Sequence, residues 1–306
     1  MSRKLLALLL TVMIPAGLAA RELTSSYVVT AAANKAGVGN TDWHTDLTLY
    51  NPHDYALPVV LQFLRSGQSN TSSVPTVTFD VNAWETLNLW DVLGPDGFSA
   101  RGSTGAFFVY ADDQKIACSG AGCDFAVFAR TYTLDPRGGN GEFGQAVPGF
   151  PAGLGLDRSV IAFMPQIIDD SDFRTNCGVA SWTNAMVRVR FDLQDAAGNV
   201  IDRRDHWVPP FGHVQWRLEH SVAGGTVAAY IMDGPDDAMV FPYASVVNWT
   251  TGDAVNIEAH LTTVGVSAQS AVARGALIAR PGAAPAPWFS LQALRRRTPI
   301  TPSAPQ

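Results

Sequence analysis

Three cysteines offer the most specific chemistry in this sequence. Cys118 and Cys123 flank four small residues, Ser-Gly-Ala-Gly, at the expected tip of a hairpin. The spacing differs from that of a redox Cys-x-x-Cys pair and no histidine cluster adjoins it, so a local disulfide is favoured over a metal or redox pair. Such a disulfide would stabilise the fold by at most about 2 kcal/mol, because the loop that it closes is short. Cys177 falls at an inward strand position and is predicted to be a small, buried, free thiol.

Histidine and aspartate, the other common metal ligands, lack a metal-binding arrangement. The six histidines include no His-Glu-x-x-His pair and no other zinc spacing. Aspartates cluster at residues 112–113, 169–172 and 233–237, but no EF-hand loop is present to converge their oxygens on one cation. Turn chemistry explains these clusters, with structural calcium as the alternative. We therefore predict no cofactor.

Signatures of catalysis and of phosphate binding are also missing from the sequence. It contains no Gly-x-Ser-x-Gly elbow and no Walker loop. A triad assembled from distant positions leaves no local signature, and a glycan hydrolase that uses scattered carboxylates is the enzyme that would fit best. Because no catalytic motif is present, we expect a protein that is not an enzyme.

Aromatic side chains are the remaining candidates for ligand contact. Eight tryptophans and seven tyrosines could form a face on which sugar rings stack. Three tryptophans in core-like strand registers are expected to pack inside: Trp43, Trp84 and Trp216. Trp182 and Trp249 lie outside clean strand patterns, and they are the candidates for ligand stacking at the surface.

The composition indicates which elements must position these residues. Of 306 residues, 47% are hydrophobic and 16% are charged, which suits a folded chain with a buried core. Asp outnumbers Glu by 22 to 5, a bias toward turn-rich β-structure because Asp favours turns and Glu favours helices. The net charge of −6 argues against nucleic-acid binding. Outside the N-terminus no apolar run reaches the ~18 residues of a membrane span.

The N-terminus has the organisation of an export signal. A short basic region precedes an apolar stretch from Leu5 to Ile14, and small residues at Gly17 and Ala19 fit the cleavage positions. We therefore predict a signal peptide over residues 1–19 and a secreted or periplasmic mature protein. Such a compartment is oxidising, so disulfides are allowed.

The body of the chain contains an internal duplication. Five segments recur in the same order, at an offset that falls steadily from 130 to 115 residues. The matched segments begin at Trp43 and Phe173, Val59 and Val187, Ala83 and Pro210, Phe107 and Val227, and Phe128 and Tyr243. Five matches in one order indicate two copies of one unit, with an insertion in the first copy around residues 111–123.

Each copy alternates apolar and polar residues with the period of half-buried strands. Val187, Val189 and Phe191 are expected to face one side of a sheet, and Arg188 and Arg190 the other. Turn signals separate six to eight short strands in each copy. This pattern predicts an all-β chain of two tandem antiparallel β-sandwiches.

The expected domain boundaries follow from composition. Glycine and proline dominate residues 149–155, which separate a first β-sandwich domain at 20–152 from a second at 157–265. The alternative is one large barrel or sandwich made from both halves, whose strands pair across this boundary. Residues 266–306 form a tail rich in Pro, Ala and Arg, expected to be largely extended or disordered. Within it, residues 288–297 could make a short amphipathic helix that contacts anionic lipid or the protein's own acidic surface.

The segment Phe173-Arg174-Thr175-Asn176, its counterpart beginning at Trp43, and residues 244–253 resemble tandem immunoglobulin-like sandwich modules of poorly characterised exported bacterial proteins. The resemblance covers residues 27–262. It implies a fold and a compartment, and it transfers no catalytic residues. From it we expect an exported, non-enzymatic interaction or structural module of the cell envelope, whose partner is an unknown protein or glycan. A carbohydrate-binding module is the alternative function.

Overall fold

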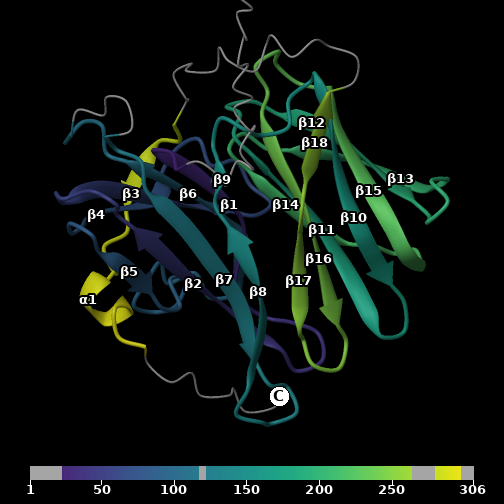
Figure 1. The fold of residues 1–306 in the computed structure, drawn as a ribbon, viewed down its shortest axis with the longest axis horizontal. Helices are drawn as coiled ribbons and strands as arrows, with labels where there is room; N and C mark the ends of the chain where they lie inside the picture. The colour runs from purple at the N-terminus through teal and green to yellow at the C-terminus, as the bar shows by residue number, and fades with distance from the viewer. Residues whose placement is uncertain (1–22, 117–121, 264–279, 298–306) are drawn as a thin grey trace, which may run out of the picture.

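The computed structural model describes residues 23–116, 122–263 and 280–297. It is an all-β molecule in which two groups of antiparallel strands lie side by side (Figure 1). We call residues 23–152 the first half and residues 156–263 the second half. The all-β class expected from the sequence is confirmed, while the signal peptide expected at residues 1–19 lies outside the described residues.

The strands are distributed evenly between the halves. The first half contains β1 (Ser26–Ala36), β2 (Asp42–Tyr50), β3 (Leu57–Arg65), β4 (Val74–Val81), β5 (Thr86–Leu89), β6 (Ser103–Ala111), β7 (Ala126–Leu134), β8 (Glu142–Pro148) and β9 (Phe150–Pro151). The second half contains β10 (Val160–Asp169), β11 (Phe173–Ser181), β12 (Val187–Gln194), β13 (Val200–Val208), β14 (His213–Arg217), β15 (Val222–Asp233), β16 (Val240–Asn248), β17 (Ala254–Glu258) and β18 (His260–Thr263). A short strand β19 (Ala283–Pro285) and a one-turn helix α1 (Leu291–Leu294) follow.

The two halves have the same strand order. In the first half, β4-β3-β6-β1-β9 are neighbours in one layer and β5-β2-β7-β8 in the other. In the second half, the corresponding orders are β13-β12-β15-β10-β18 and β14-β11-β16-β17. Each strand of one half therefore has a counterpart in the same place in the other, as a duplicated sequence requires. One difference is that β1 also pairs with β2, through Lys35 and Trp43, which joins the two layers of the first half.

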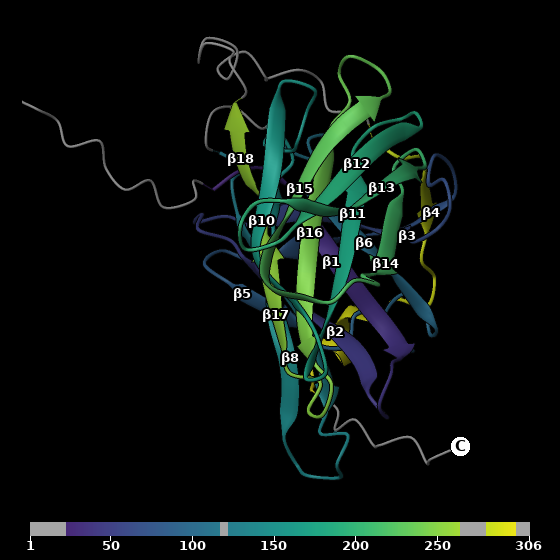
Figure 2. The same ribbon diagram turned by 90° about the vertical axis from the view of Figure 1, so that its right-hand side faces the viewer.

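Pairing between the strands of the two halves is confined to one isolated bridge among the described residues, between Ser66 and His213. All pairs of the strands β1 to β18 otherwise stay within one half. Figure 2, viewed from the side of the second half, shows its strands in front of those of the first. The larger sandwich with strands paired across residues 149–155 does not form.

Alternation along the strands separates core from solvent as expected. In β12, Val187, Val189 and Phe191 are buried, whereas Arg188 and Arg190 lie on the more exposed face. The outer face of β12 and its edge neighbour β13 is held by ion pairs such as Arg190–Asp205, with Nε and Oδ1 2.7 Å apart. Charged side chains on an edge strand also discourage pairing with other chains.

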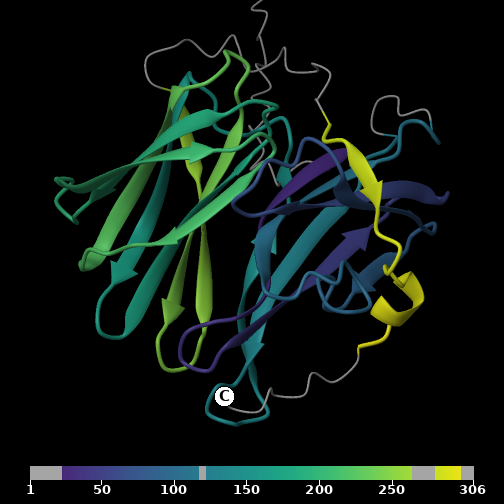
Figure 3. The ribbon, with the colours of Figure 1, turned by 180° about the vertical axis from the view of Figure 1, so that it is seen from behind.

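The C-terminal segment packs against the first half (Figure 3). Strand β19 adds in parallel to β4. The ring of Phe289 lies 6.3 Å from that of Phe79 and 5.1 Å from that of Phe98, and Leu294 is buried. Residues 280–297 are therefore ordered, and the expectation of disorder is wrong for them, because their apolar side chains complete the core of the first half. The helix within it is only one turn long, and the rest of the tail lies outside the described residues.

The cysteines are placed partly as predicted. Cys177 is a buried free thiol on β11, which confirms the prediction. Cys123 is also buried, in the connection between β6 and β7 that holds the insertion of the first copy. Cys118 lies outside the described residues, so the disulfide between Cys118 and Cys123 stays a prediction.

Candidate ligand-binding cleft

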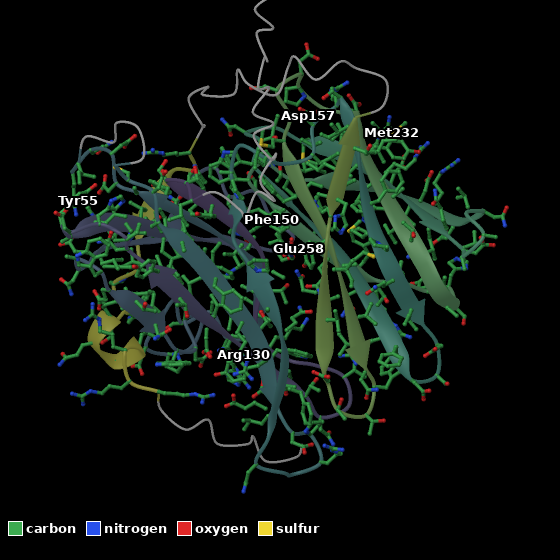
Figure 4. The ribbon with its side chains drawn as sticks, in the orientation of Figure 1. Tyr55, Arg130, Phe150, Asp157, Met232 and Glu258 are labelled. Atoms are coloured by element: carbon green, nitrogen blue, oxygen red, sulfur yellow. The ribbon has the colours of Figure 1, made fainter. Side chains whose placement is uncertain are left out.

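A cleft of about 500 Å3 lies between the two halves. Figure 4 shows the side chains of the halves meeting along this junction, beside Phe150 of β9 and Glu258 of β17. The cleft is lined from the first half by residues 31–33 and 35–38, Trp43, Thr104, Thr131 and Gln145, and from the second half by Arg174, Asn176, residues 215–217, Tyr243, Ser245 and Val247. This volume is in the range that small-molecule sites occupy.

Strand alternation places the polar residues of the second half on the cleft. On β11, Arg174 and Asn176 line the cleft, while Cys177 belongs to the core of the second half. Cross-strand partners share one face of a sheet. Asn176 is paired with Arg217 of β14 on one side and with Ser245 of β16 on the other. Three neighbouring strands therefore present their polar side chains to the first half.

Two of these residues, Arg174 and Arg217, cover the ring of Trp249. The Cζ atom of Arg217 lies 4.6 Å from the ring centroid, and that of Arg174 lies 5.0 Å from it. These distances are typical of cation–π interactions. The indole Nε1 donates a hydrogen bond to the carbonyl of Asp170 at 3.3 Å, which orients the ring. The guanidinium groups lie over the ring of Trp249, where a sugar would have to stack. We therefore interpret Trp249 as a support for the two arginines and not as a platform for sugar stacking.

Arg174 is the most deeply buried charge of the cleft. Its exposed fraction is 5%, and its Nη1 atom is buried with no hydrogen-bond acceptor among the described residues. Burial lowers the pKa of Arg174, and Arg217 lowers it further, while Asp169 opposes the change. A guanidinium group does not lose its proton in a protein. The positive charge of Arg174 therefore remains.

The wall from the first half adds one more cation and an amide. Lys35 is exposed at the end of β1, and Gln145 of β8 accepts a hydrogen bond from Ser245 Oγ at 2.7 Å through its Oε1. The lining residues that the structure describes include no Asp, Glu, His or Cys. The cleft can therefore donate hydrogen bonds and attract negative charge, but it contains no carboxylate or imidazole that could act as a general base.

The half-buried Ser66 and the buried residues His213 and Tyr243 connect the halves next to this cleft. His213 Nδ1 lies 3.0 Å from Ser66 Oγ, and His213 Nε2 lies 2.8 Å from the hydroxyl of Tyr243. Burial lowers the pKa of His213 to about 3, so the imidazole is neutral at physiological pH. Among the described residues, no carboxylate hydrogen-bonds to the imidazole as it does in a Ser-His-Asp triad. We interpret the three residues as a structural contact.

Trp182 lies in an aromatic cluster between the halves and not at the surface. Its exposed fraction is 6%, and its ring packs against Phe108 of β6 and, with centroids 5.4 Å apart, against Phe211. The prediction of ligand stacking by Trp182 is therefore wrong, because both halves cover its ring. Trp84 was expected in the core but is 61% exposed, on a turn where its φ is 58°.

The aspartate clusters serve the turns in which they lie. The Asp170 carboxylate, for example, accepts hydrogen bonds from the backbone N–H groups of Asp172 and Phe173, both at 2.8 Å. Within the described residues, no group of three or more His, Cys, Asp or Glu side chains could hold a metal ion. The part of the chain that the structure describes also has no helix with the length and hydropathy needed to cross a membrane.

Comparison with known proteins does not assign this chain to a family. No protein-family model matches this chain, and no curated protein is significantly similar to it.

Sequence reasoning missed the cationic residues of the cleft, Lys35, Arg174 and Arg217. The alternation within Phe173-Arg174-Thr175-Asn176 was a usable signal, because it puts Arg174 and Asn176 on the face opposite the sandwich core. That face would ordinarily be solvated. Only the docking of the first half makes it a cleft and buries Arg174.

Proposed function

We propose that this chain is an exported, non-enzymatic binding module of the cell envelope, built from two tandem immunoglobulin-like sandwiches that bind a ligand between them. The main support is the composition of the cleft. It combines three cations with several amides and hydroxyls, and the described lining residues include no Asp, Glu or His. Such a lining suits recognition of a polar or negatively charged ligand.

The firm junction between the halves supports a binding role as well. The loop after β3 donates hydrogen bonds from the N–H groups of Gly67 and Asn70 to the carbonyls of His213 and Pro210, at 2.8 and 3.0 Å. A cleft between two firmly docked sandwiches has its shape before a ligand arrives. Preorganisation of this kind lowers the entropic cost of binding.

Cross-linking in the envelope of the native host tests this function. The cleft is filled by Gln215→Trp, and Thr78→Trp on the exposed face of β4 is the matched control. We expect one cross-linked product to form with the wild type and with Thr78→Trp and to be lost with Gln215→Trp. Equal cross-linking by all three proteins would contradict a role for the cleft.

Export is tested separately by the mass of the protein recovered outside the cytoplasm. We expect its first residue to be Ala20 or Arg21, because small residues precede these positions. Recovery of a chain that still begins at Met1 would contradict an exported module.

Carbohydrate binding is the alternative function, favoured because the amides of Gln145, Asn176 and Gln215 line the same cleft as the indole of Trp43. Amide side chains and aromatic rings are the groups that sugars use most. A glycan array distinguishes this alternative. Binding of one glycan class that Gln215→Trp abolishes and Thr78→Trp preserves would favour it over recognition of a protein.

A further inference from the structure

We infer that the cleft binds an oxyanion of its ligand (a carboxylate, sulfate or phosphate group) at the guanidinium groups of Arg174 and Arg217. This inference rests on the proposed function, because it names the chemical group that the same cleft takes.

The first support is the unpartnered, buried donor of Arg174. A buried cation destabilises a fold unless an opposite charge or hydrogen-bond acceptors compensate it. Nη1 of Arg174 is buried without an acceptor among the described residues. The nearest compensating carboxylate, Asp169, lies 3.8 Å from a nitrogen of Arg217 and accepts the backbone N–H of Thr175 at 2.8 Å. An oxyanion in the cleft would supply the acceptor that Arg174 lacks.

The duplication provides an internal comparison. His44 occupies on β2 the position that Arg174 occupies on β11, and both side chains are buried. In the first half, the Asp91 carboxylate lies 3.0 Å from Nδ1 of His44. In the second half, the carboxylate of Asp169 acts on the pKa of Arg174, but no carboxylate of the described residues forms an ion pair with Arg174. The same position therefore has a carboxylate at contact distance in one copy and only a more distant one in the other.

The net positive charge around the cleft also supports oxyanion binding. Arg174, Arg217 and Lys35 contribute three positive charges, and the carboxylate of Asp169 lies 3.8 Å from a nitrogen of Arg217. The planar fork of a guanidinium group binds two oxygens of a carboxylate, sulfate or phosphate at once. The amides of Asn176 and Gln215 line the same space and can donate further hydrogen bonds.

Calorimetric titration of the purified full-length protein at low ionic strength tests the inference. The probes are sodium glucuronate, inorganic sulfate and inorganic phosphate, with glucose as the neutral control. We expect at least one oxyanion to bind and glucose not to bind, and added salt to weaken the binding because charge drives it. Glucuronate as the best probe would indicate an acidic sugar, and phosphate or sulfate an esterified ligand.

Four variants connect the binding to the two arginines. Arg174→Gln and Arg217→Gln are each expected to weaken oxyanion binding by about tenfold or more, because each removes a charged fork. Arg188→Gln is the matched control, since Arg188 also lies over a tryptophan, Trp207, at 5.6 Å but outside the cleft. If Arg174→Gln fails to fold, Arg217→Gln and the charge-preserving Arg174→Lys replace it. Arg174→Lys is expected to bind more weakly because it lacks the fork.

The outcomes separate this inference from the proposed function. Failure of every oxyanion to bind the folded wild type, or unchanged binding in Arg217→Gln, would overturn the inference. Binding that survives Gln215→Trp would do the same, because the anion would then lie elsewhere. The proposed function itself is tested by the cross-linking experiment. Loss of cross-linking in Gln215→Trp but not in Arg217→Gln would keep the cleft as the binding site and reject the oxyanion.

Discussion

His213 and Asn70 are polar residues buried where the two halves meet, and the side chain of each has a hydrogen-bonding partner in the opposite half, Ser66 and Phe211 respectively. The Asn70 side chain donates a hydrogen bond to the carbonyl of Phe211 at 2.8 Å. His213 lies within hydrogen-bond distance of Ser66 and Tyr243. Arg174 differs from them because its buried Nη1 has no hydrogen-bond partner in the part of the chain that the structure describes.

The neutral state of His213 predicts a pH-dependent stability. Burial lowers its pKa to about 3 in the folded protein, below the ordinary value of 6.5. Between these values the unfolded chain binds a proton that the folded protein does not, so stability falls as the pH falls. Between pH 7 and pH 4 this single residue should remove about 3 kcal/mol from the free energy of unfolding.

Urea denaturation of the wild type and of His213→Gln over this pH range measures the effect. The carboxylates titrate in both proteins, so the difference between the two profiles of unfolding free energy against pH gives the contribution of the His213 imidazole alone. We expect a steeper acid decline in the wild type. Parallel profiles would show that His213 is not buried as a neutral group.

Thiol reactivity tests the cysteine assignments. Burial raises the pKa of Cys177 to about 12, so almost no thiolate forms at neutral pH. The native protein should therefore not react with a thiol reagent, and the denatured, unreduced protein should be labelled once, at Cys177. Labelling at three positions would remove the disulfide between Cys118 and Cys123, and labelling of the native protein would contradict the burial of Cys177.

At the scale of elements, the C-terminal segment closes an edge of the first half. Strand β19 covers part of β4, which is otherwise the end of its layer. Unpaired edge strands can add strands from other chains. Three arginines attach the segment to acidic residues of the first half, through Arg280–Asp113, Arg295–Glu85 and Arg297–Glu142.

Truncation before residue 280 should therefore destabilise the first half and increase aggregation. Removing Phe289 and Leu294 exposes the core that they cover, and loss of each large apolar side chain costs about 2–5 kcal/mol. Hydrogen exchange should show faster exchange in β4. The control is a chain that ends at Arg297, for which we expect wild-type stability. Equal stability of both truncated chains would show that the segment does not dock.

At the scale of the whole molecule, the two halves form one unit through contacts on several elements. The turn after β16 touches the first half at Gly252, whose φ is 75°. A side chain at Gly252 would lie 2.9 Å from Cγ2 of Thr41 and 3.0 Å from Cγ2 of Thr133. The aromatic cluster around Trp182 and the bonds at His213 add to this junction. We expect the wild type to unfold in a single cooperative transition.

Substitution at Gly252 should weaken the junction. Gly252→Val introduces both backbone strain and steric conflict with the first half, whereas Gly198→Val introduces the strain alone, since its φ is 86° and nothing lies near its added carbon. The strain costs about 1–2 kcal/mol in each variant. Calorimetry should show a further loss, or two separated transitions, only for Gly252→Val. Identical thermograms for the two variants would contradict a tight junction.

The sequence by itself determined the local organisation of this protein. Alternation of apolar and polar residues, as in Val187-Arg188-Val189-Arg190, fixed which side of each strand faces its own core, because side chains on a strand alternate in direction. The duplicated pattern predicted that both halves share one strand order, and Cys177 followed from its inward register. These features depend on residues that are close in sequence or that pair within one half.

Only the tertiary structure decided what happens on the outer faces of the strands. Trp182, expected at the surface, is buried, and Arg174, on a face that alternation leaves to solvent, is enclosed, because the other half covers both. The C-terminal segment is ordered for a similar reason, since its apolar side chains meet a core formed by distant residues. Contact between surfaces far apart in the chain depends on their combined shape and charge. No local pattern of residue types specifies that combination.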